Sequence, residues 1–294
     1  MTREGDDRVS IDRATGEGGA ERVRSRATES ARLQASDLAL HYDKRPVLDG
    51  VDVAIPDGEF TVIIGPNACG KSTLLRGLSR MMRPARGNAF LDGKAITSLP
   101  AKQLARELGL LPQSPIAPDG ITVADLVARG RYPHQKLLRQ WSRTDEEVVT
   151  EALRSTGAQD LAERGIDELS GGQRQRVWIA MALAQQTPIL LLDEPTTFLD
   201  IAHAVEVLDL CADLHEHGRT LVAVLHDINH ACRYATNLIA MKDGAIVAQG
   251  KPSEVITVEL VEQVFDLPCR VIDDPESDTP LIIPKVRQRQ ASTV

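Results

Sequence analysis

The chain has 294 residues, of which 42% are hydrophobic, and its 42 acidic and 34 basic side chains give a formal net charge of −8. This length and composition suit one large globular domain or two smaller ones, and the acidic balance argues against nucleic acid as the main partner. No apolar run approaches the roughly 18 residues that cross a bilayer, and neither an apolar signal region nor a C-x-x-C pair is present, so we expect a cytoplasmic protein with free thiols.

The amino-acid composition of the N-terminal part of the chain changes near residue 34. Residues 1–33 are rich in Arg, Glu, Asp, Gly and Ser and poor in large aliphatic side chains, which predicts a disordered tail. The alternative for this segment is an arm that docks on a partner. Residues 38–42 and 47–55 then read as two short strands. Short strands ahead of a β–α unit predict a small antiparallel β-subdomain.

A phosphate-binding loop is the strongest motif in the chain. An apolar, β-branched run at 60–64 predicts a buried strand, and Leu74, Leu75 and Leu78 lie on one face of a helix that follows. Between them lies a stretch that fits G-x-x-x-x-G-K-[ST], followed by Thr73: Gly65, Pro66, Asn67, Ala68, Cys69, Gly70, Lys71 and Ser72.

The residue types of this loop match the chemistry of a phosphate. Glycines let the backbone approach an anion, and successive N–H groups at a helix N-terminus point positive dipole at it. Lys71 should reach the β- and γ-phosphates of a nucleotide, and the Ser72 hydroxyl should bind Mg²⁺. A glycine-rich turn with a chance lysine is the structural alternative, which the strand–loop–helix context disfavours.

A helical insertion is expected in the middle of the chain, over about 114–185. Before it, the sequence predicts strands at 88–92 and 108–111 and a short helix at 101–107, and Gln113 follows the second strand. Within it, charges are dense and apolar residues recur at helical spacing, with a break of structure at 129–134.

The second half of the chain alternates helices with fully apolar strands. Leu169-Ser170-Gly171-Gly172-Gln173 opens a helix, and four aliphatic residues at 189–192 predict a strand buried on both faces that ends in Asp193 and Glu194. Further elements are expected as follows: helices at 203–215, 228–235 and within 251–268, a buried strand at 220–225 before His226, a hairpin at 238–248, and a C-terminal extension at 269–294.

This order of motifs resembles the ATPase subunits of ABC transporters over about residues 34–290. LSGGQ between a P-loop and an aliphatic strand ending in Asp-Glu separates that family from other P-loop enzymes. The resemblance implies an α/β fold with a RecA-like P-loop core, an antiparallel β-subdomain and an inserted helical subdomain. The ATPase domain would then span 34–268.

Two acidic residues carry the expected reaction. Asp193, beside the P-loop, can bind Mg²⁺ through water while Ser72 binds it directly. Glu194 is the candidate general base, which would polarise a water for in-line attack on the γ-phosphate of ATP. A solvated acidic pair at a strand end is the alternative, and Lys71 and Ser72 in the same chain disfavour it.

Further site residues are assigned by the resemblance. Gln113 matches the Q-loop glutamine, which touches Mg²⁺ or the attacking water. His226 matches the switch histidine, which can hydrogen-bond the γ-phosphate and orient Glu194. Tyr42 matches the aromatic that stacks on adenine, with an ordinary strand aromatic as its alternative. Asp200 matches the D-loop, which faces the partner subunit.

The LSGGQ segment implies a second copy of the chain. Ser170 and the amides of Gly171 and Gly172, with Gln173, open a helix and so form another anion site. In the resembled family this site caps the γ-phosphate held by the opposite subunit, so that two copies enclose two ATP molecules. Because the chain holds one P-loop and one LSGGQ, a homodimer is the default expectation.

Two residues inside the P-loop depart from the usual pattern. Cys69 lies close to a helix N-terminus, which lowers thiol pKa, so a redox switch is conceivable; a small loop residue is the favoured interpretation. Ala68 stands where the family often has glycine, and we therefore expect the backbone there to avoid a glycine-only conformation.

Three stretches, 122–134, 225–235 and 272–275, indicate the subfamily. They are similar to ATPases that import ferric siderophores, haem and cobalamin, and most of all to the ferric enterobactin type. The resemblance implies ATP and Mg²⁺, a membrane permease and, indirectly, a siderophore-binding protein as partners. It also implies a peripheral place on the cytoplasmic side of the membrane.

Other functions remain open at this stage. Haem or cobalamin import would use the same residues, and a soluble ABC ATPase without a permease would share the motifs. A DNA-repair or chromosome-organising ATPase is disfavoured, because residues 74–188 hold no sustained heptads and no cysteine.

Overall fold

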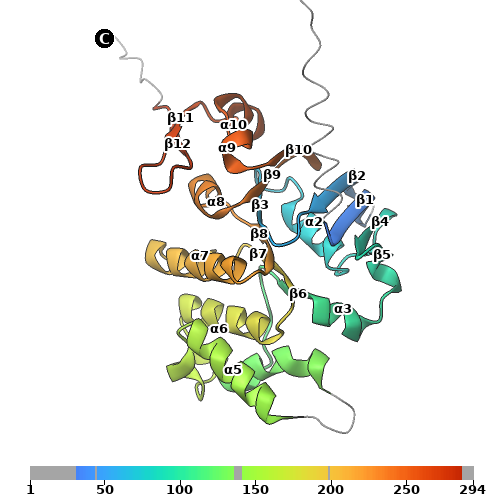
Figure 1. Ribbon diagram of the computed structural model, residues 1–294, viewed down its shortest axis with the longest axis vertical. Coiled ribbons are helices and arrows are strands. Elements are labelled where there is room, and N and C mark those ends of the chain that lie inside the picture. Colours follow the sequence, from blue (N-terminus) through green and yellow to red (C-terminus); the bar gives the residue numbers. More distant parts are fainter. Residues whose placement is uncertain (1–30, 44, 136–140, 198, 287–294) are drawn as a thin grey trace, which may run out of the picture.

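A computed structural model describes residues 31–43, 45–135, 141–197 and 199–286. The predicted N-terminal tail lies, except for its last three residues, outside the described residues. In the described part the chain forms a six-stranded sheet, a four-stranded sheet, a two-stranded hairpin and a group of helices at one end of the molecule (Figure 1).

The six-stranded sheet is the centre of the molecule. Its strand order is β10-β9-β3-β8-β7-β6, and every neighbouring pair is parallel except the antiparallel pair β9 and β10. The bounds of these strands are β3 Phe60–Ile64, β6 Leu108–Leu111, β7 Ile189–Asp193, β8 Thr220–Val224, β9 Asn237–Lys242 and β10 Ala245–Gly250. The predicted apolar runs therefore become the central parallel strands, with the P-loop strand β3 between β8 and β9.

Both faces of this sheet are covered, which explains the unbroken apolar runs of its strands. In β7, Leu190 and Leu192 face one hydrophobic core while Ile189 and Leu191 face the other. The first core contains side chains of α6 (Gly171–Ala184), α7 (Ile201–Glu216), α8 (Ile228–Tyr234) and α10 (Val258–Phe265). The second core contains those of α2 (Lys71–Leu78) and of the N-terminal sheet.

The N-terminal sheet has the order β2-β1-β4-β5, with antiparallel pairs throughout. Its strands are β1 Leu33–Tyr42, β2 Arg45–Ile55, β4 Arg86–Leu91 and β5 Lys94–Ala95. The strand predicted at 38–42 thus starts five residues earlier than expected. Leu33, which the sequence placed in the tail, is fully buried as the first residue of β1.

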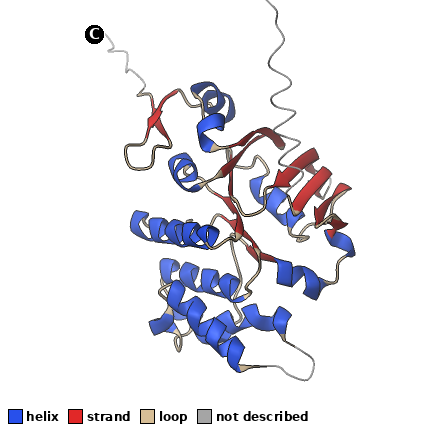
Figure 2. Cartoon of the chain, viewed as in Figure 1, coloured by secondary structure: helices blue, strands red, loops and turns tan. Residues whose placement is uncertain are grey.

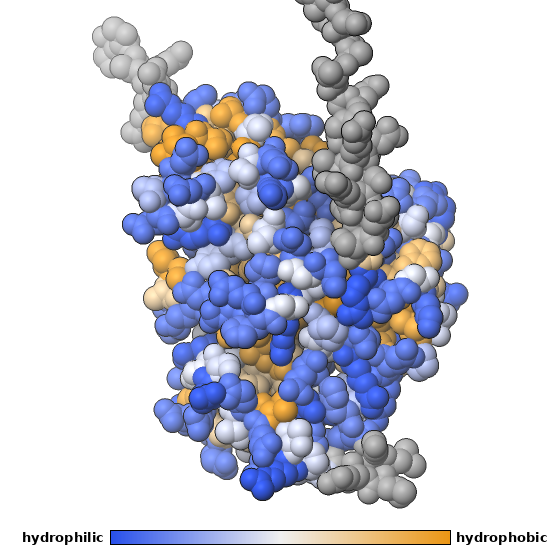
Figure 3. Space-filling model, viewed as in Figure 1, coloured by the Kyte–Doolittle hydropathy of each residue, from blue (hydrophilic) through white to orange (hydrophobic). Residues whose placement is uncertain are grey.

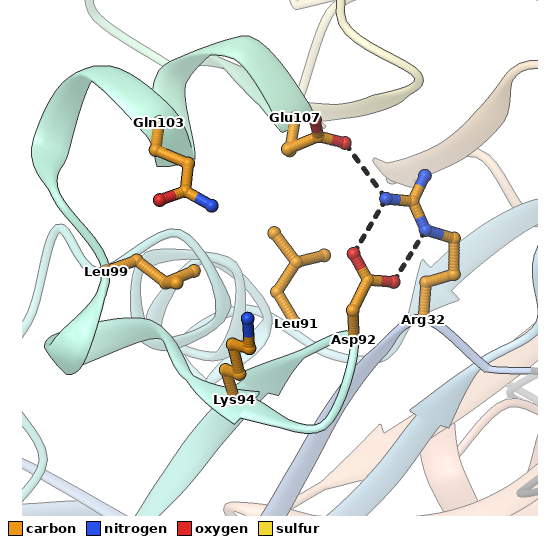
Figure 4. A pocket seen from close by; sticks show the side chains of 7 residues that line it. All are labelled: Arg32, Leu91, Asp92, Lys94, Leu99, Gln103 and Glu107. Carbon is orange, nitrogen blue, oxygen red and sulfur yellow. Dashed lines mark hydrogen bonds and ion pairs between the residues drawn. The ribbon is translucent and has the colours of Figure 1, made fainter.

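The residue before this strand is held as well. Arg32 forms ion pairs with Asp92, at 2.8 Å, and with Glu107, at 2.9 Å. Figure 4 shows these pairs at the edge of a hollow of about 130 Å³, which is lined by Arg32, Leu91, Asp92, Lys94, Leu99, Gln103 and Glu107. Glu107 ends helix α3 (Ala101–Glu107), so the two ion pairs tie the start of β1 to the sheet and to this helix.

The predicted helical insertion is present as a cluster of helices below the central sheet in Figure 2. It contains α4 (Val123–Ala128), α5 (Arg143–Ser155) and α6. The break predicted at 129–134 is wrong, because Arg129–His134 forms the 3-10 helix η2 directly after α4. Arg131 is buried there and pairs with Asp145 at 2.9 Å, and this polar contact fixes η2 against α5.

The C-terminal segment forms regular structure up to Pro284. After α9 (Pro252–Val255) and α10, strands β11 (Cys269–Asp273) and β12 (Pro280–Pro284) pair as an antiparallel hairpin. Figure 3 shows apolar surface at the end of the molecule that carries these elements. No helix in the described ranges is long and apolar enough to cross a membrane.

Candidate functional site

The P-loop connects β3 to α2 and wraps tightly against its neighbours. A Cβ atom added to Gly65 would lie 2.3 Å from the Met241 carbonyl oxygen, so only glycine fits there. Gly70 precedes α2 with φ 106°, which is also a conformation for glycine. Lys71 is buried, and its ammonium donates to the carbonyl oxygens of Gly65 and Pro66, each at 2.9 Å. The ammonium group of Lys71 is therefore bound by the first two residues of the P-loop.

Ala68 has a backbone conformation that the sequence did not indicate. Its φ is 61°, in the left-handed region that favours glycine. For a residue with a Cβ atom this conformation costs roughly 1–2 kcal/mol, so the loop stores a small backbone strain at this position.

Cys69 also differs from the simplest expectation. The thiol is 4% exposed, and burial, more than any other cause, raises its pKa, although Lys71 acts in the opposite direction. The expected lowering by the helix N-terminus is therefore outweighed. A raised thiol pKa favours the interpretation of Cys69 as a small, unreactive loop residue.

Asp193 ends strand β7 next to the P-loop and is 2% exposed. Burial raises the pKa of its carboxyl group, and a hydrogen bond from Ser72 lowers it in part. Its Oδ1 atom has no hydrogen-bond partner among the described residues. A buried carboxylate oxygen without a partner, beside a serine hydroxyl, fits a hard cation such as Mg²⁺.

Glu194 is the centre of a hydrogen-bonded group that the sequence predicted in part. Its Oε1 lies 2.7 Å from His226 Nε2, and its Oε2 accepts from Gln113 Nε2 at 2.6 Å and from Thr197 Oγ1 at 3.1 Å. Its φ is 56°, a conformation rare for residues other than glycine. The predicted Q-loop glutamine and the predicted switch histidine thus both contact the predicted base. Thr197 was not predicted, because a threonine after Asp-Glu-Pro-Thr carries no signal of its own.

Tyr42 lies at the end of β1, 43% exposed, and its hydroxyl accepts from Arg76 of α2 at 2.6 Å. Arg76 belongs to the helix that follows the P-loop. The contact keeps the aromatic ring near that helix with part of its surface open, which suits the predicted stacking on a base.

The LSGGQ residues form a separate surface. Ser170 caps helix α6 by accepting from the Gln173 amide at 3.3 Å, while Gln173 Oε1 accepts from the Ser170 amide at 3.1 Å. Neither Gly171 nor Gly172 has a positive φ. A Cβ atom at Gly171 would meet nothing within 4 Å, and one at Gly172 would meet only Leu199, at 3.5 Å. Nothing in the described part of the chain itself therefore requires glycine at these positions.

A hollow of about 250 Å³ lies beside this surface. It is lined by Ser170, Gly172, Gln173, Arg176, Leu199, Asp200 and His203, and no P-loop residue is among them. The structure thus places Asp193 beside Ser72 of the P-loop, Gln113 and His226 on Glu194, and Tyr42 on the helix that follows the loop. The LSGGQ residues and Asp200 line a separate hollow.

The comparisons with known proteins agree with this geometry. The family model described as "ABC transporter" matches residues 48–197. The ferric enterobactin transport ATP-binding protein FepC of Escherichia coli K12 is 57% identical over 259 residues, which is 87% of this chain and 96% of that protein. The petrobactin import ATP-binding protein FpuD of Bacillus anthracis is 52% identical, over 88% of this chain and 95% of that protein.

The chain belongs to the ABC transporter family. Among solved structures, the dimeric structure of MJ0796, a bacterial ABC transporter cassette, superposes with a TM-score of 0.67 at 28% identity, over 74% of this chain and 98% of that one. The sheet and the helical insertion described above are therefore those of an ABC cassette, and the chain is an ABC-type ATPase that binds nucleotide.

His203 is a residue of this ABC cassette that the sequence did not single out. Its backbone N–H and its Nδ1 both lie within hydrogen-bond distance of Asp200 Oδ1, at 2.9 and 2.8 Å. Because a carboxylate only accepts, Nδ1 carries the proton and Nε2 is left to contact other groups. The i, i+3 spacing from Asp200 at a helix start is the signal that could have identified it.

Proposed function

We propose that this chain is the ATP-hydrolysing subunit of an importer of ferric siderophores. The observation that carries the proposal is the 57% identity with FepC over nearly the whole of both proteins. FpuD, named for a different siderophore, is similar at 52%. Likeness to both supports the class of ferric siderophores and leaves the individual compound open.

In the proposed reaction the P-loop binds the phosphates of ATP. Lys71 would leave its two loop carbonyls for the β- and γ-phosphates, and Ser72, Asp193 and Gln113 would hold Mg²⁺. When bound, Mg²⁺ would neutralise phosphate charge.

Glu194 would act as the general base for the attacking water. The carboxylate accepts hydrogen bonds from Gln113 and Thr197 on one oxygen and faces His226 with the other. His226 would keep this oxygen oriented and donate toward the γ-phosphate once nucleotide is present. Such positioned proton transfer contributes about 10²- to 10⁴-fold to a rate.

The active form in this proposal is a homodimer. The LSGGQ surface lies apart from the P-loop of its own chain, and Gly171 faces open space where a phosphate of a second subunit's ATP could approach. Two copies would therefore complete two ATP sites head to tail, as expected for an isologous pair. The dimer would sit on a membrane permease at the cytoplasmic face, and a siderophore-binding protein would deliver the cargo on the other side.

Uptake by cells lacking this chain tests the proposal. Iron-loaded catecholate, hydroxamate and citrate-type chelates are supplied in parallel with haem and cobalamin. We expect loss of uptake confined to ferric siderophores, restored by the parental chain and not by Glu194→Gln. Loss of haem uptake alone, or of cobalamin uptake alone, would show that this compound is the cargo and not a ferric siderophore. Normal uptake of the whole panel, together with absence of the protein from membrane fractions of parental cells, would favour a soluble ABC ATPase.

A further inference from the structure

The C-terminal hairpin holds helix α8 through paired polar contacts. The Asn229 side chain accepts from the Ile282 backbone amide at 2.8 Å and donates to the Ile282 carbonyl at 3.3 Å, so it bonds β12 as a neighbouring strand would. One turn further along α8, Arg233 Nη2 lies 2.6 Å from Asp274 Oδ2. Both ends of this short helix are therefore tied to the hairpin.

Asp274 is built into the hairpin turn. It is 5% exposed, its Oδ1 accepts from the Glu276 amide at 3.0 Å, and its own amide donates to the Thr279 carbonyl at 2.8 Å. The Glu276 amide and Arg233 both hold the pKa of this carboxyl below its ordinary value. The Asp274 carboxylate is therefore held in place by the turn, and its ion pair with Arg233 links α8 to the hairpin.

Helix α8 is in turn continuous with the switch histidine. His226 is followed by Asp227, whose carboxylate caps α8 by accepting from the amides of Asn229, at 2.8 Å, and His230, at 2.9 Å. The backbone amide of Asn229 therefore donates to the capping Asp227, while its side chain is hydrogen-bonded to Ile282 of the hairpin. A chain of short contacts runs from Ile282 through Asn229 and Asp227 to His226.

The imidazole of His226 depends on its backbone for its place. The side chain is 46% exposed and lies 2.7 Å from Glu194 Oε1. A half-exposed ring is not fixed by packing, so a shift of the first turn of α8 changes the distance between His226 and Glu194 directly.

From these contacts we infer that the β11–β12 hairpin is a positioning element for His226, and that Asn229, Arg233 and Asp274 are its positioning residues. The inference rests on the proposed role of His226 in hydrolysis. It gives the stretch Ile272-Asp273-Asp274-Pro275 a function in place of a plain surface turn.

Steady-state ATP hydrolysis by the full chain tests the inference. Asp274→Asn keeps an oxygen for the Glu276 amide but removes the charge that bonds Arg233. We expect kcat to fall roughly tenfold, because small displacements of reacting groups are costly, with KM for ATP within about twofold. Asp266→Asn is the matched control: it removes an exposed carboxylate of the same C-terminal region that lies 3.3 Å from Lys242 and not against α8, and it should leave both constants unchanged.

A double-mutant cycle separates positioning from stability. In a His226→Ala background, Asp274→Asn should cause no further loss of the residual rate, because no imidazole remains to be positioned. If the same tenfold loss persists there, or if Asp274→Asn alone hydrolyses ATP at the parental rate, the inference is wrong. Asn229→Ala, which leaves the Asp227 cap in place, provides the same test should Asp274→Asn fail to fold.

The outcome is distinguishable from failure of the proposed function. If His226→Ala hydrolyses ATP at the parental rate, the role proposed for His226 is wrong, and the inference about the hairpin is wrong as well. Normal siderophore uptake in cells lacking the chain would refute the proposed cargo. It would not affect the double-mutant cycle, which is measured by ATP hydrolysis.

Discussion

Replacing Glu194 by glutamine separates ground-state geometry from chemistry at this site. The carboxylate accepts from Gln113 and Thr197 through Oε2 and faces His226 through Oε1. A glutamine amide oxygen can still accept from Gln113 and Thr197, and its N–H groups can donate to a neutral His226. The folded structure should therefore change in stability by no more than about 1 kcal/mol.

The catalytic effect should be far larger. An amide cannot take the proton of the attacking water, so the contribution of a general base, about 10²- to 10⁴-fold, is lost. At about 1.36 kcal/mol for each factor of ten, the barrier should rise by roughly 3–5 kcal/mol. The protein should bind ATP with unchanged affinity and accumulate as a dimer that holds nucleotide.

Two measurements on the purified protein check this pair of expectations. Phosphate release gives kcat, and size-exclusion chromatography with and without ATP gives the oligomeric state. Thr197→Val, which removes one contact to Glu194 and keeps the carboxylate, is the control and should lower kcat much less. Hydrolysis by Glu194→Gln within twofold of the parental rate would show that another group is the base.

Two further predictions concern the buried groups of the loop. Asp193→Asn should raise the Tm of the nucleotide-free protein at neutral pH by a few degrees, for about 1 kcal/mol, while hydrolysis is lost. The sign follows from the raised pKa: the ionised, buried carboxylate destabilises the fold above the ordinary carboxyl pKa, and the cost disappears in acid, so the two Tm values should converge as pH falls. An equal Tm at all pH values would contradict this. Cys69 should react with N-ethylmaleimide at least about 100-fold more slowly in the folded than in the unfolded chain, because its thiol is buried and its pKa is raised. Peptide mass mapping gives the rate, and labelling at the unfolded rate would refute the structural account of this residue.

The parts of the fold that follow from local chemistry could be predicted. A strand buried on both faces must be apolar at every position, so the aliphatic residues 189–192 predicted a central strand. A glycine-rich turn between such a strand and a helix predicted the phosphate site. The contact of Glu194 with His226 was expected once the family's motif order was recognised, whereas its contact with Gln113 was not. In each case the signal lies within a few consecutive residues.

The rest depends on contacts between residues distant in sequence. Arg131 and Asp145, or Arg233 and Asp274, read separately as surface charges, and only the packed structure shows that one or both partners of each pair are buried. The left-handed conformation of Ala68 was not predicted, because an alanine gives no local signal for it. Leu33 was assigned to the tail because one buried leucine at the edge of a polar segment carries no periodic signal.

The free space at Gly171 and Gly172 has a consequence for how variants of this protein are to be judged. A methyl group at either position meets no obstacle in the isolated subunit. Replacing Gly171 or Gly172 by alanine should therefore leave the melting temperature, expression level and solubility unchanged. If the proposed dimer is right, a defect would emerge only when two subunits close on nucleotide. Measurements on the purified monomer would then not detect the role proposed for these two glycines.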